Sequence, residues 1–346
     1  MNNLCKYGTH RVIFPLGTLP QTADKINNEM VCQDNEILVD VDTLNIDSAS
    51  FTQIKNACES NIEKMKEMIE NIVNNKGKMQ NPVTGSGGMF LGRIKEIGKN
   101  LQVDIKLGDK ITSLVSLSLT PLKIEKILSI DLSKDQVNII GQAILFETGI
   151  YAKIPSDLPA NIVLSALDVA GAAAQVEKLV KKDDNVLILG AGGKSGILCA
   201  YQAKKSAGKN GKVVALIHSN RHREDLEKLG VCDHIIVGDA TKPMDIYNLV
   251  KEVVPELIDV TINVVNVPNT EMTSILPTKS SGTIYFFSMA TSFTKAALGA
   301  EGIASEALMI IGNGYTKNHA EFTLNLLRES KVLYQIFKER YGSDQV

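Results

Sequence analysis

Tryptophan is absent from this chain of 346 residues, and aromatic residues make up only 5% of it. Proteins that bind single-stranded nucleic acid stack bases on aromatic side chains, so this scarcity argues against such a surface. The formal net charge is −2, which provides no attraction to nucleic acid or to an anionic membrane. We therefore expect neither nucleic acid nor a membrane as a partner.

Cysteines and long apolar runs are also scarce. The five cysteines are odd in number and widely spaced, which fits neither a disulfide framework nor a C-x-x-C zinc site. No apolar run approaches the roughly 20 residues that a membrane helix needs, and there is no N-terminal signal pattern. Together these absences predict a protein of the reducing cytoplasm.

The most informative stretch that is present covers residues 185–198, NVLILGAGGKSGIL. Its residues Val186 to Leu189 show no alternation, which is typical of a parallel strand buried on both faces. The glycines that follow allow a sharp turn, and the start of the next helix is a binding site for a pyrophosphate. The residues expected to bind the cofactor here are Gly190, Gly192, Gly193, Lys194, Ser195 and Gly196.

This glycine pattern is weak evidence by itself. Ser195 stands where G-x-G-x-x-G has its third glycine, so an ordinary glycine-rich turn would fit equally well. The flanks decide, because strand and helix patterns alternate from Ala160 to Phe287, as in a parallel sheet with right-handed crossovers. Before Pro155 the chain is β-rich. One helix is expected there, beginning at a capping box at Ser50 to Gln53 and ending at Gly77. We expect one domain over residues 1–155 and a second over residues 156–300. A C-terminal segment over residues 301–346 is expected to pack back across both domains and to contain a long helix at residues 320–340.

The order of these features resembles the medium-chain dehydrogenase/reductase family. Besides VLILGAGG, the stretch GGMFLGRIKEIG at residues 87–98 looks like the family's G-H-E-x-x-G-x-x-x-x-x-G segment, and residues 108–110 look like its G-D-x-V turn. The resemblance implies an α/β fold with a doubly wound Rossmann sheet and a β-rich, GroES-like catalytic domain. It also implies NAD or NADP as the cofactor.

The chain departs from zinc-dependent members of this family at the metal-ligand positions. Asp47 matches the first ligand, a cysteine, while Gly88 and Met89 match the His and Glu of G-H-E. The third ligand position matches Asp168. Two carboxylates without a histidine would not hold zinc well, so we expect no metal.

The same departure suggests catalytic residues. By analogy Asp47 and Asp168 point into the cleft that zinc would occupy, where two carboxylates suit a cationic substrate. Alternatively, Asp47 caps a turn and Asp168 is a solvated helix residue. Glu147 is a third candidate, which could also be structural. The expected substrate-binding residues are Ser48 and a group assigned to the turn that replaces the zinc ligands, namely Ser86, Gly87, Gly88, Arg93 and Lys95.

The end of the second Rossmann strand bears on cofactor choice. NAD-preferring sites usually have Asp or Glu there, whereas this strand is followed by Ser219, Asn220 and Arg221. Serine and arginine suit a 2′-phosphate and favour tolerance of NADP, although they could simply begin an exposed basic helix. Residues 263–266, which include Val265 and Asn266, and the pair Ser288 and Met289 are expected on the nicotinamide side.

Longer stretches narrow the resemblance. GSGGMFLGRIKEIG at residues 85–98 and GNGYTKNHAEFTLNLLRES at residues 312–330 are similar to the diamino-acid dehydrogenases of anaerobic lysine fermentation. This similarity implies NAD(P)⁺-dependent oxidative deamination of a diamino acid. Two alternatives remain: a zinc-free quinone or enone reductase of the same superfamily, and a non-catalytic cofactor-binding protein. The apolar segment Gly282 to Met289 could be a sheet edge that pairs in a homodimer or homotetramer.

Overall fold

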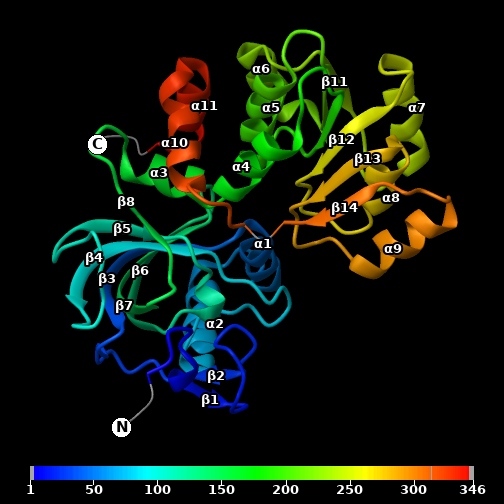
Figure 1. Ribbon diagram of the computed structural model, residues 1–346. Coiled ribbons are helices and arrows are strands. Elements are labelled where there is room, and N and C mark those ends of the chain that lie inside the picture. Colours follow the sequence, from blue (N-terminus) through cyan, green and yellow to red (C-terminus); the bar gives the residue numbers. More distant parts are fainter. Residues whose placement is uncertain (1–3, 313, 343–346) are drawn as a thin grey trace. The chain divides into compact units, whose positions relative to one another are not determined.

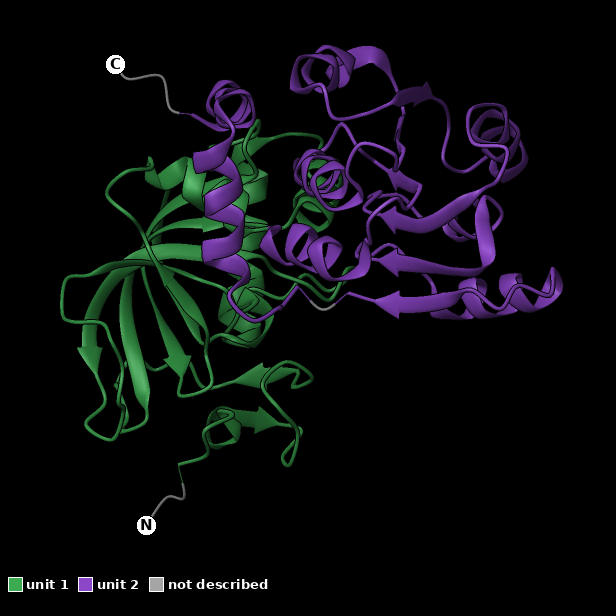
Figure 2. Ribbon diagram, turned by 45° about the horizontal axis from the view of Figure 1, so that its top comes forward, with its two compact units in different colours: residues 1–168 green, residues 169–346 purple. Residues whose placement is uncertain are grey.

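The structure is a computed structural model that describes residues 4–312 and 314–342. The chain divides into two compact units, residues 1–168 and residues 169–346, coloured green and purple in Figure 2. The division follows a helix, α3 (Ala160–Leu167), whereas the sequence pattern changes at Pro155, before that helix begins. No helix in the described ranges is both long enough and apolar enough to cross a membrane.

Unit 1 is built on an antiparallel six-stranded sheet with the order β6-β7-β3-β4-β5-β8. At one end of β3, Asn45 lies opposite Met89 of β4 and Gln136 of β7, and this end carries the candidate site. A separate sheet pairs two short strands near the N-terminus. The strands of unit 1 are β1 (Val12–Phe14), β2 (Lys25–Ile26), β3 (Glu36–Asn45), β4 (Met89–Ile97), β5 (Lys110–Ser113), β6 (Leu122–Asp131), β7 (Gln136–Phe146) and β8 (Tyr151–Lys153).

Two helices, α1 (Ser48–Ala57) and α2 (Ile62–Lys76), replace the single helix predicted from Ser50 to Gly77. Glu59 and Ser60 have φ values of 53° and 60°, and this left-handed backbone breaks the helix although the apolar spacing continues across it. Gly77 ends α2 in a left-handed conformation, as the sequence predicted.

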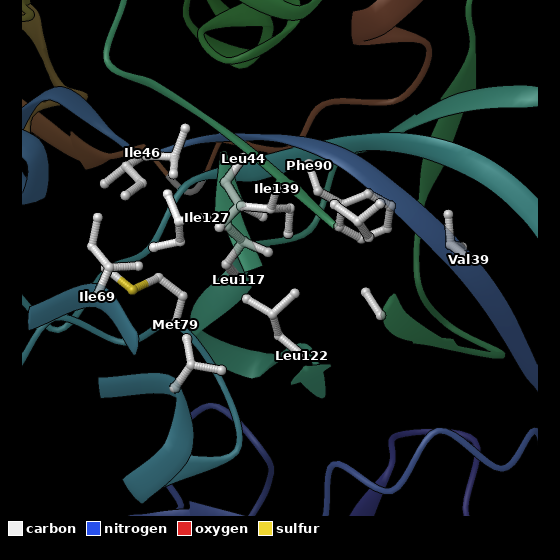
Figure 3. Packing of buried hydrophobic residues seen from close by; sticks show 14 of the residues in the cluster. Val39, Leu44, Ile46, Ile69, Met79, Phe90, Leu117, Leu122, Ile127 and Ile139 are labelled. Carbon is white, nitrogen blue, oxygen red and sulfur yellow. The ribbon is translucent and has the colours of Figure 1, made fainter. Parts of the chain in front are cut away.

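The core of unit 1 lies between its sheet and these helices. Figure 3 shows how Leu44 of β3, Phe90 of β4 and Ile139 of β7 point into one cluster with side chains from α2 and the following loop. Met65 of α2 is fully buried in this cluster. Each such side chain contributes about 1.5–3 kcal/mol by leaving water.

Unit 2 contains the predicted Rossmann sheet, labelled in Figure 1. Its six strands are parallel and have the order β11-β10-β9-β12-β13-β14, so the sheet is doubly wound from β9. The elements are α4 (Ala170–Leu179), β9 (Val186–Leu189), α5 (Lys194–Ala207), β10 (Val213–Ile217), α6 (Arg223–Leu229), β11 (His234–Val237), α7 (Pro243–Val253), β12 (Ile258–Asn263), α8 (Glu271–Ile275), β13 (Thr278–Phe286), α9 (Phe293–Gly302) and β14 (Leu308–Ile311).

Two expectations about unit 2 are wrong. The segment Gly282 to Met289 is not a sheet edge, because β13 pairs with both β12 and β14 and the edge strand is β14. The long helix expected over 320–340 is two helices, α10 (His319–Glu329) and α11 (Lys331–Tyr341). Ser330 has extended backbone, and its side chain caps α11, so a serine favourable at an N-cap interrupts a continuous amphipathic pattern.

Candidate functional site

The loops after several parallel strands meet at one edge of the unit 2 sheet. Leu189, at the end of β9, lies opposite Leu216 of β10 and Asn263 of β12. Asn263 in turn lies opposite Phe286 of β13. The segments that follow these strands therefore lie at the carboxyl edge, where doubly wound sheets bind ligands.

The glycine-rich loop after β9 has the geometry of a phosphate cradle. Gly190 has a φ of +84°, and a Cβ atom on Gly196 would lie 2.2 Å from the Gly190 carbonyl oxygen. Gly196 thus lets α5 pack closely against the loop. It takes the part of the motif's third glycine, although it stands one position later than the motif expects. Gly193 is the N-cap of α5 and has no side chain that could cap the helix, and uncapped helix N-termini are typical sites for an anion.

Ser219, Asn220 and Arg221 are exposed immediately after β10. The loop they belong to touches the glycine-rich loop, since a Cβ atom on Gly192 would lie 3.1 Å from the Cβ atom of His222. The pKa of His222 is lowered by burial and then by the positive charges of Arg340 and Arg221. A third basic residue, Arg223, is paired with Glu227 at 2.7 Å. Arg221 is therefore the exposed basic residue of this loop.

The residues expected on the nicotinamide side divide into two groups. Val265 lies near the glycine-rich loop, because a Cβ atom on Gly190 would be 3.2 Å from its Cγ2 atom, and Asn266 is exposed beside it. Ser288 and Met289 line a small cavity of about 170 Å³ beyond β13 and β14. Asn263 does not belong with them: it is buried, and its side-chain amide donates to Thr270 and Ser274.

Asp47 in unit 1 is the N-cap of α1. Its Oδ1 atom accepts a hydrogen bond from the backbone N–H of Ser50 at 3.0 Å. Its Oδ2 atom is buried and has no hydrogen-bond partner within the described ranges. The alternative that Asp47 is a capping residue is therefore correct for one of its two oxygens. The predicted capping box at Ser50 is wrong, because the helix begins two residues earlier, at Ser48. A buried carboxylate oxygen without a donor is one that a bound cation would satisfy.

Gly88, one of the positions expected to match a zinc ligand, has no room for a side chain. Gly88 has a φ of +96°, and a Cβ atom on it would lie 2.0 Å from the Asn45 carbonyl oxygen and 2.7 Å from the Asp47 nitrogen. Met89 is buried at the start of β4. Among the residues that the structure describes, no three His, Cys, Asp or Glu side chains group as metal ligands would.

Three hydroxyl groups gather beside Asp47. The Ser50 Oγ atom lies 2.6 Å from Thr84 Oγ1 and 3.0 Å from Ser86 Oγ, and the Ser86 hydroxyl lies 3.1 Å from Thr84 Oγ1. Gly87 follows at a position where a Cβ atom would be 2.2 Å from the Met79 carbonyl oxygen. The hydroxyl of Ser48 instead donates to Asp135 at 2.9 Å.

Three other predicted residues are not brought to this end of the sheet. Glu147 is exposed next to Phe146, which lies opposite Glu36 at the far end of β3, roughly 30 Å from Asn45 at 3.4 Å per residue. Arg93 and Lys95 are not on the turn either: both are exposed in β4, and Lys95 pairs with Asp40 at 3.2 Å. Asp168 is the C-cap of α3, and its part in the site stays a prediction.

Sequence reasoning missed Ser50, Thr84 and Arg340. Ser50 and Thr84 could have been found from the sequence, because each lies within three positions of a predicted site residue. Arg340, in α11, donates from Nη1 to the carbonyl oxygen of Gly192 at 2.9 Å. No local pattern could connect two residues so far apart in the sequence.

The chain matches a family model and two curated proteins. The model is described as the L-erythro-3,5-diaminohexanoate dehydrogenase N-terminal domain, and it matches residues 10–155. The chain is 56% identical to the L-erythro-3,5-diaminohexanoate dehydrogenase of Fusobacterium nucleatum over 99% of this chain and all of that protein. It is 55% identical to the enzyme of the same name from Acetoanaerobium sticklandii over 97% of this chain and 99% of that protein.

Solved structures resemble the chain in fold. The CurK enoyl reductase has a TM-score of 0.56 and 14% identity, with 97% of this chain and 84% of that chain covered. A mycobacterial protein in complex with NADPH also has a TM-score of 0.56 and 14% identity, with 90% of this chain and 84% of that chain covered. At these identities the likeness extends to the fold alone.

Proposed function

This chain belongs to the L-erythro-3,5-diaminohexanoate dehydrogenase family, and we propose that it oxidatively deaminates (3S,5S)-3,5-diaminohexanoate to 5-amino-3-oxohexanoate and ammonia. It is an oxidoreductase acting on a CH–NH₂ group. The observation that supports this proposal at the level of residues is the buried Oδ2 atom of Asp47, which has no hydrogen-bond donor among the described residues. A substrate with two ammonium groups supplies the missing partner.

A nicotinamide cofactor suits the carboxyl edge of the unit 2 sheet. The glycine-rich loop leads into a helix whose N-cap, Gly193, has no capping side chain, and side chains at Gly190 or Gly196 would obstruct the approach of a ligand. NAD(P)⁺ bound there would accept the hydride that leaves C3 of the substrate. Ser219, Asn220 and Arg221 would lie toward the adenosine ribose, while Val265, Asn266, Ser288 and Met289 would lie toward the nicotinamide.

Asp47 is the proposed base. An ammonium nitrogen has no lone pair to stabilise the developing iminium, so the 3-amino group must lose a proton before hydride leaves. The Oδ2 atom of Asp47 takes that proton and releases it to solvent, and the regenerated carboxylate then takes a proton from the water that attacks the iminium. Asp168 is proposed to pair with the 5-ammonium group. The hydroxyl of Ser86, supported by Ser50 and Thr84, is the proposed donor to the substrate carboxylate.

The quinone or enone reductase alternative is not favoured. A reductase of that kind needs an apolar pocket, whereas Asp47 and the hydroxyl groups of Ser50 and Ser86 make this end of unit 1 polar. Offering the diamino acid with NAD⁺ and, separately, a quinone with NADH or NADPH tests the choice. Turnover of the quinone without turnover of the diamino acid would overturn the proposal. A non-catalytic protein would turn over neither.

Cofactor choice is proposed to depend on Arg221. Arg221→Ala is expected to raise the KM for NADP⁺ about 10-fold and to leave the KM for NAD⁺ within twofold, because only NADP⁺ carries the 2′-phosphate. Steady-state kinetics with each cofactor measures this. Arg223→Ala is the matched control, since Arg223 is already paired with Glu227. Equal effects on both cofactors would contradict the proposed role.

Zinc independence is also proposed. The glycine at position 88 and the buried methionine after it leave two carboxylates, which bind zinc poorly without a nitrogen or sulfur ligand. Dialysis against a chelator is expected to leave kcat within twofold of its starting value, and metal analysis should find far less than one zinc ion per chain. Loss of activity that zinc restores would contradict this.

A homodimer or homotetramer is proposed to form through β14 rather than β13. The exposed fractions of Leu308 and Ile311 are 61% and 67%, so this edge strand presents apolar side chains that a second copy would cover. Leu308→Lys is expected to halve the mass measured by light scattering, from a dimer to one chain or from a tetramer to a dimer. Leu249→Lys, on α7, is the control. An unchanged mass for Leu308→Lys would contradict pairing at this edge.

A cytoplasmic location is part of the proposal. All five cysteines are free thiols in the structure, as in proteins kept in a reducing compartment.

A further inference from the structure

The last helix, α11, contacts the glycine-rich loop of unit 2 through the side chain of Arg340. Its Nη1 atom donates to the carbonyl oxygen of Gly192 at 2.9 Å. Its Nε atom donates to Asp225 Oδ2, also at 2.9 Å, and its Nη2 atom donates to the same oxygen. One guanidinium group therefore joins the middle of the loop to the first turn of α6.

This connection is partly shielded from water. The side chains of Arg340 and Asp225 are 12% and 21% exposed, so the ion pair is screened less than a surface pair would be. The same end of α11 reaches the loop a second time, because the Lys194 ammonium lies 5.7 Å from the centre of the Tyr341 ring. Lys194 is the first residue of α5, directly after the loop.

We propose that Arg340 is a positioning residue that holds the glycine-rich loop in its binding conformation through the carbonyl oxygen of Gly192. The loop's own backbone gives few constraints, because four of the seven residues from Gly190 to Gly196 are glycines. Arg340 supplies a constraint at the carbonyl side of Gly192 and leaves the N–H groups at the start of α5 to the cofactor. It acts through Gly192 and Asp225. This inference rests on the proposed binding of a nicotinamide cofactor to that loop.

The planar guanidinium is essential to this role. Arginine presents several donors in a fixed fork and can bond a carboxylate and a carbonyl together, whereas the single ammonium of lysine cannot reproduce that geometry. The proposal therefore predicts that lysine restores the charge at position 340 without restoring the function. A role limited to overall charge would be restored by lysine.

The test compares Arg340→Gln and Arg340→Lys with the unaltered chain. Both are expected to raise the KM for NAD⁺ and the dissociation constant for ADP-ribose about 10-fold, because fewer molecules hold the loop in its competent state. The kcat at saturating NAD⁺ should stay within twofold. Asp225→Asn, which keeps the bond to Gly192, should raise both constants less. Arg328→Ala, on α10 with an exposed partner, is the control.

The outcomes are distinguishable. If the unaltered chain binds neither NAD(P)⁺ nor ADP-ribose, the proposed function fails. If it binds them and Arg340→Gln binds equally well, only the positioning role fails. A fall in kcat with an unchanged KM, or full rescue by lysine, would also overturn it. If Arg340→Gln does not fold, Asp225→Asn decides: ADP-ribose affinity equal to that of the unaltered chain would contradict the proposal.

Discussion

Asp47→Asn is expected to lower kcat/KM for the diamino acid by about 100- to 1000-fold, the usual contribution of a positioned general base. Asparagine cannot take a proton from the 3-ammonium group, although its carbonyl oxygen can still accept the hydrogen bond from Ser50. Because Asn and Asp are equally good N-caps, α1 should keep its stability. Initial rates over a range of substrate concentrations, with saturating cofactor, measure the effect.

The controls for this substitution separate chemistry from capping. Asp47→Ala removes both functions and should add a stability loss of about 1 kcal/mol to the loss of rate. Asn61→Ala removes the cap of α2, where no chemistry is proposed, and should show a similar stability loss with little change in rate. If Asp47→Asn kept a rate within a few-fold of the unaltered chain, Asp47 would not be the base.

Gly196→Ala is the second substitution with a large expected effect. The new Cβ atom would lie 2.2 Å from the Gly190 carbonyl oxygen and 2.5 Å from the Ala191 Cα atom, and neither can move without shifting the loop or the helix. Forcing a methyl group into a packed site costs about 1–3 kcal/mol, or more when backbone must move. We expect the dissociation constant for NADH to rise about 5- to 150-fold, or more if the backbone must shift.

Gly302→Ala is the matched control for that prediction. Gly302 lies at the end of α9 in the same unit, and a Cβ atom there would meet no atom within 4 Å. It should bind NADH like the unaltered chain. Fluorescence titration with NADH measures both variants. Tight binding by Gly196→Ala would mean that the cofactor does not depend on the close packing of α5 against the loop.

Local sequence predicted the Rossmann sheet because its signals are local. The unbroken apolar run from Val186 to Leu189, the glycines and the following helix all lie within 14 residues, and unit 2 has the expected doubly wound parallel sheet. The interruptions were harder to predict. Glu59 and Ser60 break α1 from α2 by adopting left-handed backbone, although neither residue type favours it.

The candidate site was predictable only where a residue acts near its own sequence position. Asp47 could be identified because it stands at a position that matches a zinc ligand of the resembled family. That one of its carboxylate oxygens caps α1 while the other has no partner among the described residues depends on where α1 begins. Glu147 was a plausible carboxylate on sequence grounds, but strand register puts it at the other end of β3. Register depends on pairing between distant strands, which alternation within one strand does not specify.

The central claim is that this chain removes ammonia from a diamino acid by hydride transfer to NAD(P)⁺. The most direct test is to incubate the purified protein with (3S,5S)-3,5-diaminohexanoate and NAD⁺ or NADP⁺, and to measure reduced cofactor and ammonia in the same samples. The account predicts that both products appear together, one for one, and that neither appears without the substrate. Reduced cofactor without ammonia, or no product with either cofactor, would contradict it.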